Sequence, residues 1–306
     1  MSHTETVTPR TTRTAPKEAS PSSMGRATRD ASHQGRTGAW GRVIVLALVC
    51  LAQLLPFYLA LTTALKPLTD LSSPWTLPLS GTTLKNFSIA IEDGNTLGAI
   101  GNSAVVTVCA TLIVVVVGAL AAYPLARNRS WLNRGIELLV LSVMMIPPLA
   151  ILVPLYSMLN RMDLLNTYPG LVLPLACLEL PRAIFLYTQF LRSVPISLEE
   201  AARVDGANTV QVFSRIVLPL LTPVTVTVVI LTGVYVWNEF ALSSYIMSKD
   251  SMKTLAPAIA GFFGEQGSQV NAAVAASLMG AIPMIVAYIF LQKYFIRGML
   301  AGADKG

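Results

Sequence analysis

The stretch AIGNSAVVTVCATLIVVVVGALAAY occupies residues 99–123 and contains no acidic or basic side chain. Its 25 residues, wound as a helix at about 1.5 Å of rise per residue, are long enough to cross a hydrocarbon core of about 30 Å. The stretch is continuously apolar and lacks the period-two alternation that is typical of a transmembrane barrel strand. It therefore predicts a membrane-spanning helix.

Similar apolar stretches lie on both sides of this one. Together with residues 99–123 they predict six spans, near residues 43–65, 99–123, 136–160, 170–191, 217–237 and 272–292. Hydrophobic residues make up 53% of the chain and charged residues only 12%, about half the share found in soluble domains. This composition argues against a soluble two-domain enzyme. The expected fold class is an all-α membrane protein with six transmembrane helices.

Residues 1–42 differ from the rest of the chain. They are rich in Thr, Ser, Arg, Ala and Pro and contain almost no large apolar side chains. Such a segment buries too little apolar surface to offset the entropy of ordering it. We therefore expect a disordered tail over residues 1–42, followed by a transmembrane domain over residues 43–306.

The basic residues indicate how the spans run. Sixteen of the 22 Lys and Arg residues fall in the tail, in the segments 124–135 and 192–216, or near the C-terminus. Because cytoplasmic segments collect basic residues, these parts and both termini are expected in the cytoplasm. The net charge of +6 is then explained by membrane lipid, and a nucleic-acid partner is not needed.

The sequence offers little chemistry for catalysis. Both histidines, His3 and His33, lie in the tail, and the three cysteines Cys50, Cys109 and Cys177 lie in apolar runs, where we expect small buried side chains. No metal site or cofactor is predicted. No phosphate-binding G-x-x-x-x-G-K-[ST] loop or nucleophile motif occurs, so the chain is expected to be non-catalytic.

Residues 193–219 predict two short helices on the cytoplasmic side. Ser197 and Glu200 have the spacing of a capping box for the first helix, and Gly206 suits its end. Asn208 and Gln211 repeat the capping spacing for the second helix. Pro219 is expected in the first turn of the fifth span. Four apolar residues of the loop are expected to face away from the membrane: Leu198, Ala201, Ala202 and Phe213.

Residues 193–219 resemble the EAA loop of the membrane subunits of ABC-type importers, and we call this segment the coupling loop. The match has four parts: Glu200-Ala201-Ala202, then Gly206, Ile216 and Leu218-Pro219. The Asp205-Gly206-Ala207 variant is similar to the MalG-like carbohydrate-uptake branch. Other stretches share the likeness, which covers residues 43–306: Pro56-Phe57, Leu65-Lys66-Pro67, Asn102-Ser103, residues 121–127, residues 166–171, residues 237–240 and residues 298–306.

The resemblance implies that the coupling loop docks in a cleft of a separate ATP-hydrolysing subunit. It assigns this coupling to Glu200, Ala201, Ala202, Asp205, Gly206, Ala207, Phe213, Ile216, Leu218 and Pro219. Glu200 would orient the loop or pair with a basic group of the ATPase. The implied partners are a second homologous permease subunit, two ATP-binding subunits and an extracytoplasmic solute-binding protein.

Four polar residues are candidates for the translocation path. Glu179 and Arg182 are ionisable residues inside a predicted span, where charge is costly, and their i, i+3 spacing allows an ion pair. They would either line the path or form a structural pair, and the sequence favours the structural pair slightly. Asn238 and Glu239 follow Trp237 near the outer end of the fifth span, where they could contact the solute or the solute-binding protein. A role as an aromatic anchor at the membrane interface explains Trp237 almost as well.

The sequence thus predicts a multi-pass subunit of the bacterial cytoplasmic membrane that imports a sugar or oligosaccharide by ATP-driven transport. An importer of another polar solute, such as a polyol or glycerol phosphate, is the first alternative, because the coupling loop indicates an ATP-hydrolysing partner and does not specify the transported solute. An ion-coupled secondary transporter would normally show paired repeats and several intramembrane acids, which are not evident here. An intramembrane enzyme lacks candidate residues.

Overall fold

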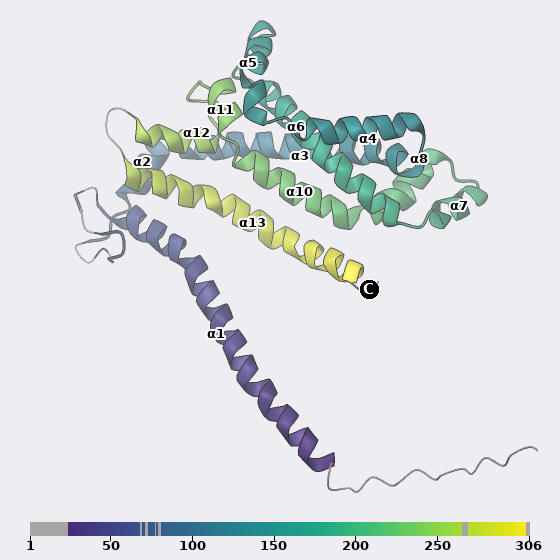
Figure 1. Ribbon diagram of the computed structural model, residues 1–306. Helices are drawn as coiled ribbons and strands as arrows, with labels where there is room; N and C mark the ends of the chain where they lie inside the picture. The colour runs from purple at the N-terminus through teal and green to yellow at the C-terminus, as the bar shows by residue number, and fades with distance from the viewer. Residues whose placement is uncertain are drawn as a thin grey trace, which may run out of the picture. The chain divides into compact units, whose positions relative to one another are not determined.

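The computed structural model describes residues 24–303 apart from residues 68, 71–72, 77, 79–80 and 265–268, and it describes side chains within residues 41–292 outside the same gaps. All regular elements in these ranges are helical, as predicted (Figure 1). They are α1 (Met24–Leu65), α2 (Lys85–Glu92), α3 (Thr96–Arg127), α4 (Trp131–Val143), η1 (Pro148–Ile151), α5 (Leu152–Arg161), α6 (Tyr168–Ser193), α7 (Ser197–Val204), α8 (Thr209–Val212), η2 (Phe213–Val217), α9 (Leu218–Leu220), α10 (Thr222–Trp237), α11 (Ala241–Ile246), α12 (Leu255–Ala260), η3 (Gly261–Phe263) and α13 (Val270–Ala303).

The chain divides into two units at Tyr58 and Leu59. In the first unit, α1 begins at Met24, so residues 24–42 are helical where disorder was expected. Ala and Arg are good helix formers, and a helix that the apolar run nucleates can extend back through them. The rest of the predicted tail, residues 1–23, lies outside the described residues.

The core of the second unit lies between α3 and α6, with α10 beside them (Figure 1). The face of α3 that enters this core carries small or β-branched residues every fourth position: Ala110, Val114, Gly118, Ala122 and Ala126. A Cβ atom added at Gly118 would lie 3.2 Å from the Cβ of Ala183 on α6. Small residues at this spacing let two helix backbones approach closely, which is how helices associate in a membrane.

A smaller alanine-rich cluster joins the end of α1 to α2, η3 and α13. Ala64, Ala90, Phe262 and Ala276 are among its buried members. Buried amides fix the chain here: Asn86 donates to the carbonyl oxygens of Ala64 and Lys66, each at 2.8 Å, and Asn271 donates to the Lys66 carbonyl at 2.9 Å. These bonds satisfy carbonyl groups that the end of α1 leaves without helical partners.

Four described helices are long and apolar enough to cross a membrane, and there are up to six spans if each of two bent pairs counts as one. The four lie in α1, α3, α6 and α13. The predicted span at 136–160 is a pair of helices bent by 91° between residues 143 and 148, next to Pro147 and Pro148. The predicted span at 217–237 also belongs to a bent pair, 209–220 and 222–237, with an angle of 69°.

The three cysteines are exposed on the described chain, so the prediction of buried side chains was wrong. Their apolar neighbours indicate helix, but an apolar run alone does not show which face of a helix enters the core. Cys109 illustrates this, because it precedes the buried Ala110 by one residue and therefore points about 100° away from it.

Candidate functional site

The predicted two-helix arrangement in the coupling loop is confirmed. Helix α7 ends at Val204, and Gly206 follows in the left-handed conformation with φ of +86°. The N–H of Gly206 donates to the Arg203 carbonyl and that of Ala207 to the Ala202 carbonyl, each at 3.0 Å. This Schellman motif satisfies the last carbonyls of α7 and turns the chain toward α8.

Of the two predicted helix caps, one is confirmed and the other is wrong. Asn208 and Gln211 form the predicted capping box, with both side-chain to backbone bonds at 2.9 Å. The predicted Ser197 cap was wrong, because Ser197 is already the first residue of α7. Ile196 precedes the helix, and its carbonyl accepts from the N–H groups of Glu199 and Glu200.

The second helix of the loop continues further than predicted. After α8 the chain forms one π-helical segment, η2, which contains Ile216, and then α9, which contains Pro219. Pro219 has no N–H for an i−4 bond, and the Leu218 N–H reaches back to the Phe213 carbonyl, five residues away. Pro219 therefore precedes the 69° bend instead of lying in the first turn of α10.

Glu199 fastens α7 to the end of α3. Its side chain is only 1% exposed, and its two carboxylate oxygens accept from Arg127 Nε at 2.7 Å and from the Tyr123 hydroxyl at 2.8 Å. Arg127 also donates through Nη1 to the carbonyls of Leu191 (2.8 Å) and Val194 (3.2 Å) at the end of α6. One ion pair thus ties three elements together, and we call Tyr123, Arg127 and Glu199 the α7 lock.

Sequence reasoning missed the α7 lock and chose the neighbouring carboxylate, Glu200, which is exposed. The available signal was the 121–127 stretch, which places a Tyr and an Arg at the cytoplasmic end of the second span. Their partner lies 72 residues away from Arg127 in the chain, and nothing in the local pattern distinguishes Glu199 from Glu200 as that partner.

The other predicted coupling residues divide between two faces of the loop. Glu200, Ala201, Asp205, Gly206, Leu218 and Pro219 are exposed, whereas Ala202, Ala207, Phe213 and Ile216 are partly buried. Phe213 does not face away from the membrane domain as expected, because its ring packs edge-on against Tyr123 at a centroid distance of 5.4 Å. The most exposed large apolar residues of the loop are two that were not among the predicted coupling residues, Val204 (87%) and Val210 (75%).

The four path candidates fall into two separate places. Glu179 and Arg182 form an ion pair on α6, and the Arg182 guanidinium lies 5.8 Å from the ring centroid of Tyr235 on α10. Glu239 instead caps α11, accepting from the N–H groups of Leu242 (2.7 Å) and Ser243 (2.9 Å). Asn238 donates to the Val234 carbonyl at 2.8 Å. No hydrogen bond or ion pair joins the two places within the residues that the structure describes.

Trp237 is buried, which does not fit an interfacial anchor. The neighbouring loop, residues 247–254, is held by side chains of the other stretches that carry the family likeness. Asn102 Nδ2 donates to the carbonyls of Ser251 (3.0 Å) and Lys253 (2.9 Å), and the Leu255 N–H donates to Ser103 Oγ at 2.8 Å. Asn166 Oδ1 accepts from the Lys249 N–H at 2.8 Å. These residues therefore shape the end of the domain opposite the coupling loop (Figure 1).

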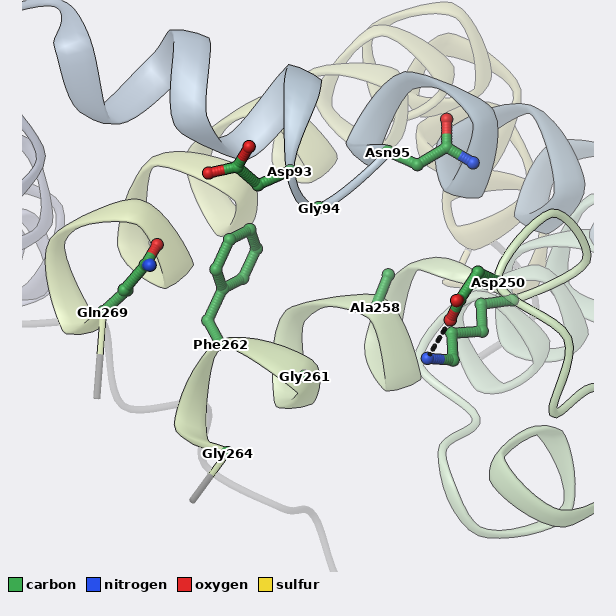
Figure 2. Close-up of a pocket in the computed structure, with 10 residues that line it drawn as sticks. Asp93, Gly94, Asn95, Asp250, Ala258, Gly261, Phe262, Gly264 and Gln269 are labelled. Atoms are coloured by element: carbon green, nitrogen blue, oxygen red, sulfur yellow. Dashed lines mark hydrogen bonds and ion pairs between the residues drawn. The ribbon is translucent and has the colours of Figure 1, made fainter. Parts of the chain in front are cut away.

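A polar cavity of about 550 Å³ opens at this opposite end, between the end of α2 and the region around α12 and η3 (Figure 2). Asp93, Asp250, Lys253 and Gln269 are among its lining residues. Lys253 Nζ lies 2.6 Å from Asp250 Oδ1, and this ammonium group lowers the pKa of the exposed Asp250 carboxyl. The sequence reasoning did not identify this cavity, because its walls come from three separated segments.

Comparisons with known proteins identify related transport proteins. A family model described as the inner membrane component of binding-protein-dependent transport systems matches residues 114–301. The melibiose/raffinose/stachyose import permease protein MelC of Bacillus subtilis (strain 168) is 40% identical over 87% of this chain and 97% of that protein. The trehalose transport system permease protein SugB of Mycobacterium tuberculosis is 32% identical over 83% of this chain and 93% of that protein.

A solved structure shares the fold. One chain of a bacterial ABC transporter involved in the import of the acidic polysaccharide alginate superposes with a TM-score of 0.69 at 20% identity, covering 86% of this chain and 98% of that chain. The family match spans more than half of the sequence, including all of α6 and the coupling loop. The chain therefore belongs to the family of inner membrane components of binding-protein-dependent transport systems.

Proposed function

We propose that the chain is a permease subunit of an ATP-driven importer that moves a sugar or oligosaccharide across the cytoplasmic membrane. Relatives that match nearly its whole length are named for melibiose, raffinose and stachyose, for trehalose and for multiple sugars. The chain itself supplies the membrane path and no ATP-binding motif, so ATP hydrolysis belongs to partner subunits.

The observation that carries this proposal is the construction of the coupling loop. Its base is fixed to α3 and α6 by the α7 lock, whereas its tip exposes the side chains of Val204 and Val210. An exposed apolar tip on a rigid base suits docking into a groove of another protein, because a push on the tip is then transmitted to the membrane helices. We infer that the importer contains two ATP-binding subunits and that one of them supplies the groove for the coupling loop of this chain.

The remaining partners follow from the same proposal. A second homologous permease subunit would complete the path, and an extracytoplasmic solute-binding protein would deliver the solute to the end that bears the 550 Å³ cavity. Both termini and the coupling loop would lie in the cytoplasm. A polyol or glycerol phosphate remains the alternative cargo, since the coupling loop would be the same for it.

Pull-down of the ATPase with Gly206 variants tests the proposal. Proline at position 206 cannot adopt φ of +86° and removes the N–H that donates to Arg203, so Gly206→Pro is expected to abolish recovery of the ATPase chain. Gly206→Asn is the matched control, because Asn tolerates the left-handed conformation and a Cβ here meets open space. It is expected to retain recovery within about threefold, a cost of about 0.6 kcal/mol or less.

Both variants must reach the membrane at the wild-type level for the comparison to count. Equal recovery of the ATPase with wild-type protein and Gly206→Pro would contradict the assignment of coupling to this loop.

A further inference from the structure

A second cavity, of about 280 Å³, lies at the same end of the domain as the coupling loop, where α3 ends, α4 begins and α6 ends. Its lining includes three arginines, Arg129, Arg134 and Arg192, and one carboxylate, Glu137. An adjoining cavity of about 530 Å³ shares Arg129 and Arg192. Neither the family likeness nor the proposed coupling uses these residues.

The charges around the smaller cavity do not cancel. Arg192 and Glu137 neutralise each other through two parallel bonds of 2.8 Å, from Nη1 to Oε1 and from Nη2 to Oε2. Arg129 and Arg134 are exposed, and no hydrogen bond or salt bridge to either guanidinium is found among the described residues, although the charge of Arg134 also acts on Glu137. With three arginines and one glutamate, the lining carries a net charge of +2, which favours an anion at this site.

The loop that carries Arg129 has a fixed shape. Asn133 Nδ2 donates to the carbonyls of Asn128 (2.7 Å) and Pro124 (3.1 Å), and Asn128 Oδ1 accepts from the Ser130 N–H at 3.1 Å. Ser130 Oγ caps α4 by accepting from the Asn133 N–H at 3.2 Å. The turn between α3 and α4 thus holds Arg129 and Arg134 beside one cavity.

An apolar surface continues from the charged cavity along α4. Leu138 and Leu141 follow Arg134 at i+4 and i+7, on the same face of the helix, and both are exposed. Trp131, at the first position of α4, is 87% exposed, and tryptophan is enriched at the level of lipid headgroups. The site therefore offers cations at one end and an apolar track that leads away from them.

We propose that this cavity binds the phosphate of an anionic phospholipid in the cytoplasmic leaflet, with an acyl chain lying along Leu138 and Leu141. The leaflet assignment rests on the proposed function, which places this end of the spans in the cytoplasm. Charge complementarity favours an anion, and the apolar track favours a lipid over a free phosphate. Basic pockets between membrane helices on the cytoplasmic side are suited to such headgroups.

Native mass spectrometry of the delipidated, assembled transporter tests the proposal. Dioleoyl phosphatidylglycerol is expected to bind at least about tenfold more tightly than dioleoyl phosphatidylcholine. The variant Arg129→Gln/Arg134→Gln is expected to weaken phosphatidylglycerol binding by about 30-fold, and each single variant by about fivefold. The matched control Lys85→Gln/Arg161→Gln removes two exposed positive charges elsewhere and is expected to leave this binding unchanged.

Three outcomes would overturn the proposal. They are equal binding of the two lipids, displacement of phosphatidylglycerol by millimolar inorganic phosphate, and loss of the second permease chain from the Arg129→Gln/Arg134→Gln complex with lipid preference intact. The second would indicate a soluble phosphate ligand and the third an acidic surface of the partner. The ATPase chain is detected in the same spectra, so a failure of the coupling proposal is seen separately.

Discussion

Glu199→Gln is expected to abolish ATP-driven uptake and to destabilise the permease, whereas Glu200→Gln is expected to leave the permease as stable as wild type. The two residues are adjacent in the EAA region, but Glu199 is buried against Arg127 and Tyr123 while Glu200 is exposed. Removing one partner of a buried ion pair leaves the other charge uncompensated, at a cost of about 3–5 kcal/mol.

The loss would affect α3, the end of α6 and α7, because Arg127 also donates hydrogen bonds to the carbonyls of Leu191 and Val194. A Gln at position 199 keeps the shape and one acceptor oxygen but loses the charge that orients the guanidinium. Without that restraint α7 can turn about the Val194–Ile196 segment independently of α3. A movement of the ATPase would then displace the coupling loop without moving the membrane helices.

Three measurements check this expectation: the unfolding temperature of the permease within the assembled transporter, its binding of the ATPase, and uptake per ATP hydrolysed. We expect Glu199→Gln to lower the unfolding temperature and to reduce uptake per ATP to background. Glu200→Gln is expected to change ATPase binding alone, if Glu200 contacts a basic group there. Tyr123→Phe removes only the 2.8 Å hydroxyl bond and should cost about 1 kcal/mol. Normal uptake per ATP with Glu199→Gln would show that the α7 lock does not transmit motion.

Long helices and local turns of this chain follow from the sequence alone. The long helices α3 and α6 extend only two to four residues beyond the spans predicted at 99–123 and 170–191, because continuous apolar runs identify helix and length directly. The turn at Gly206 was predictable for a local reason, since few residues other than glycine accept the conformation that it requires.

Contacts between segments far apart in the chain could not be predicted from the sequence. The choice between Glu199 and Glu200 depends on where Arg127 lies, and the exposure of Cys109 depends on which face of α3 meets α6. The direction of the 91° bend after Val143 could not be predicted, because the prolines at 147 and 148 interrupt a helix without fixing the new direction. Ser197 failed as a cap since Ile196 already has helical dihedral angles, which moves the start of α7 by one residue.

The Glu179–Arg182 pair gives the second large effect. Glu179→Met is expected to destabilise the permease by about 3–5 kcal/mol, because it leaves the Arg182 charge without its partner among α6 and α10. The double variant Glu179→Met/Arg182→Met is expected to recover most of that stability. Replacing both members of a buried pair by apolar residues of similar size is often neutral.

Uptake by the double variant then separates the two roles that the sequence allowed. Glu179 is only 5% exposed, and Arg182, whose side chain is 32% exposed, lies beside the Tyr235 ring, so most contacts of the pair are made within the domain. A structural pair of this kind can be removed as a unit, and we expect uptake by the double variant within about threefold of wild type, equivalent to less than 1 kcal/mol. The opposite result would be a double variant that inserts and assembles normally but carries no solute. It would place the pair on the translocation path, because the loss of uptake could not then be attributed to a loss of stability.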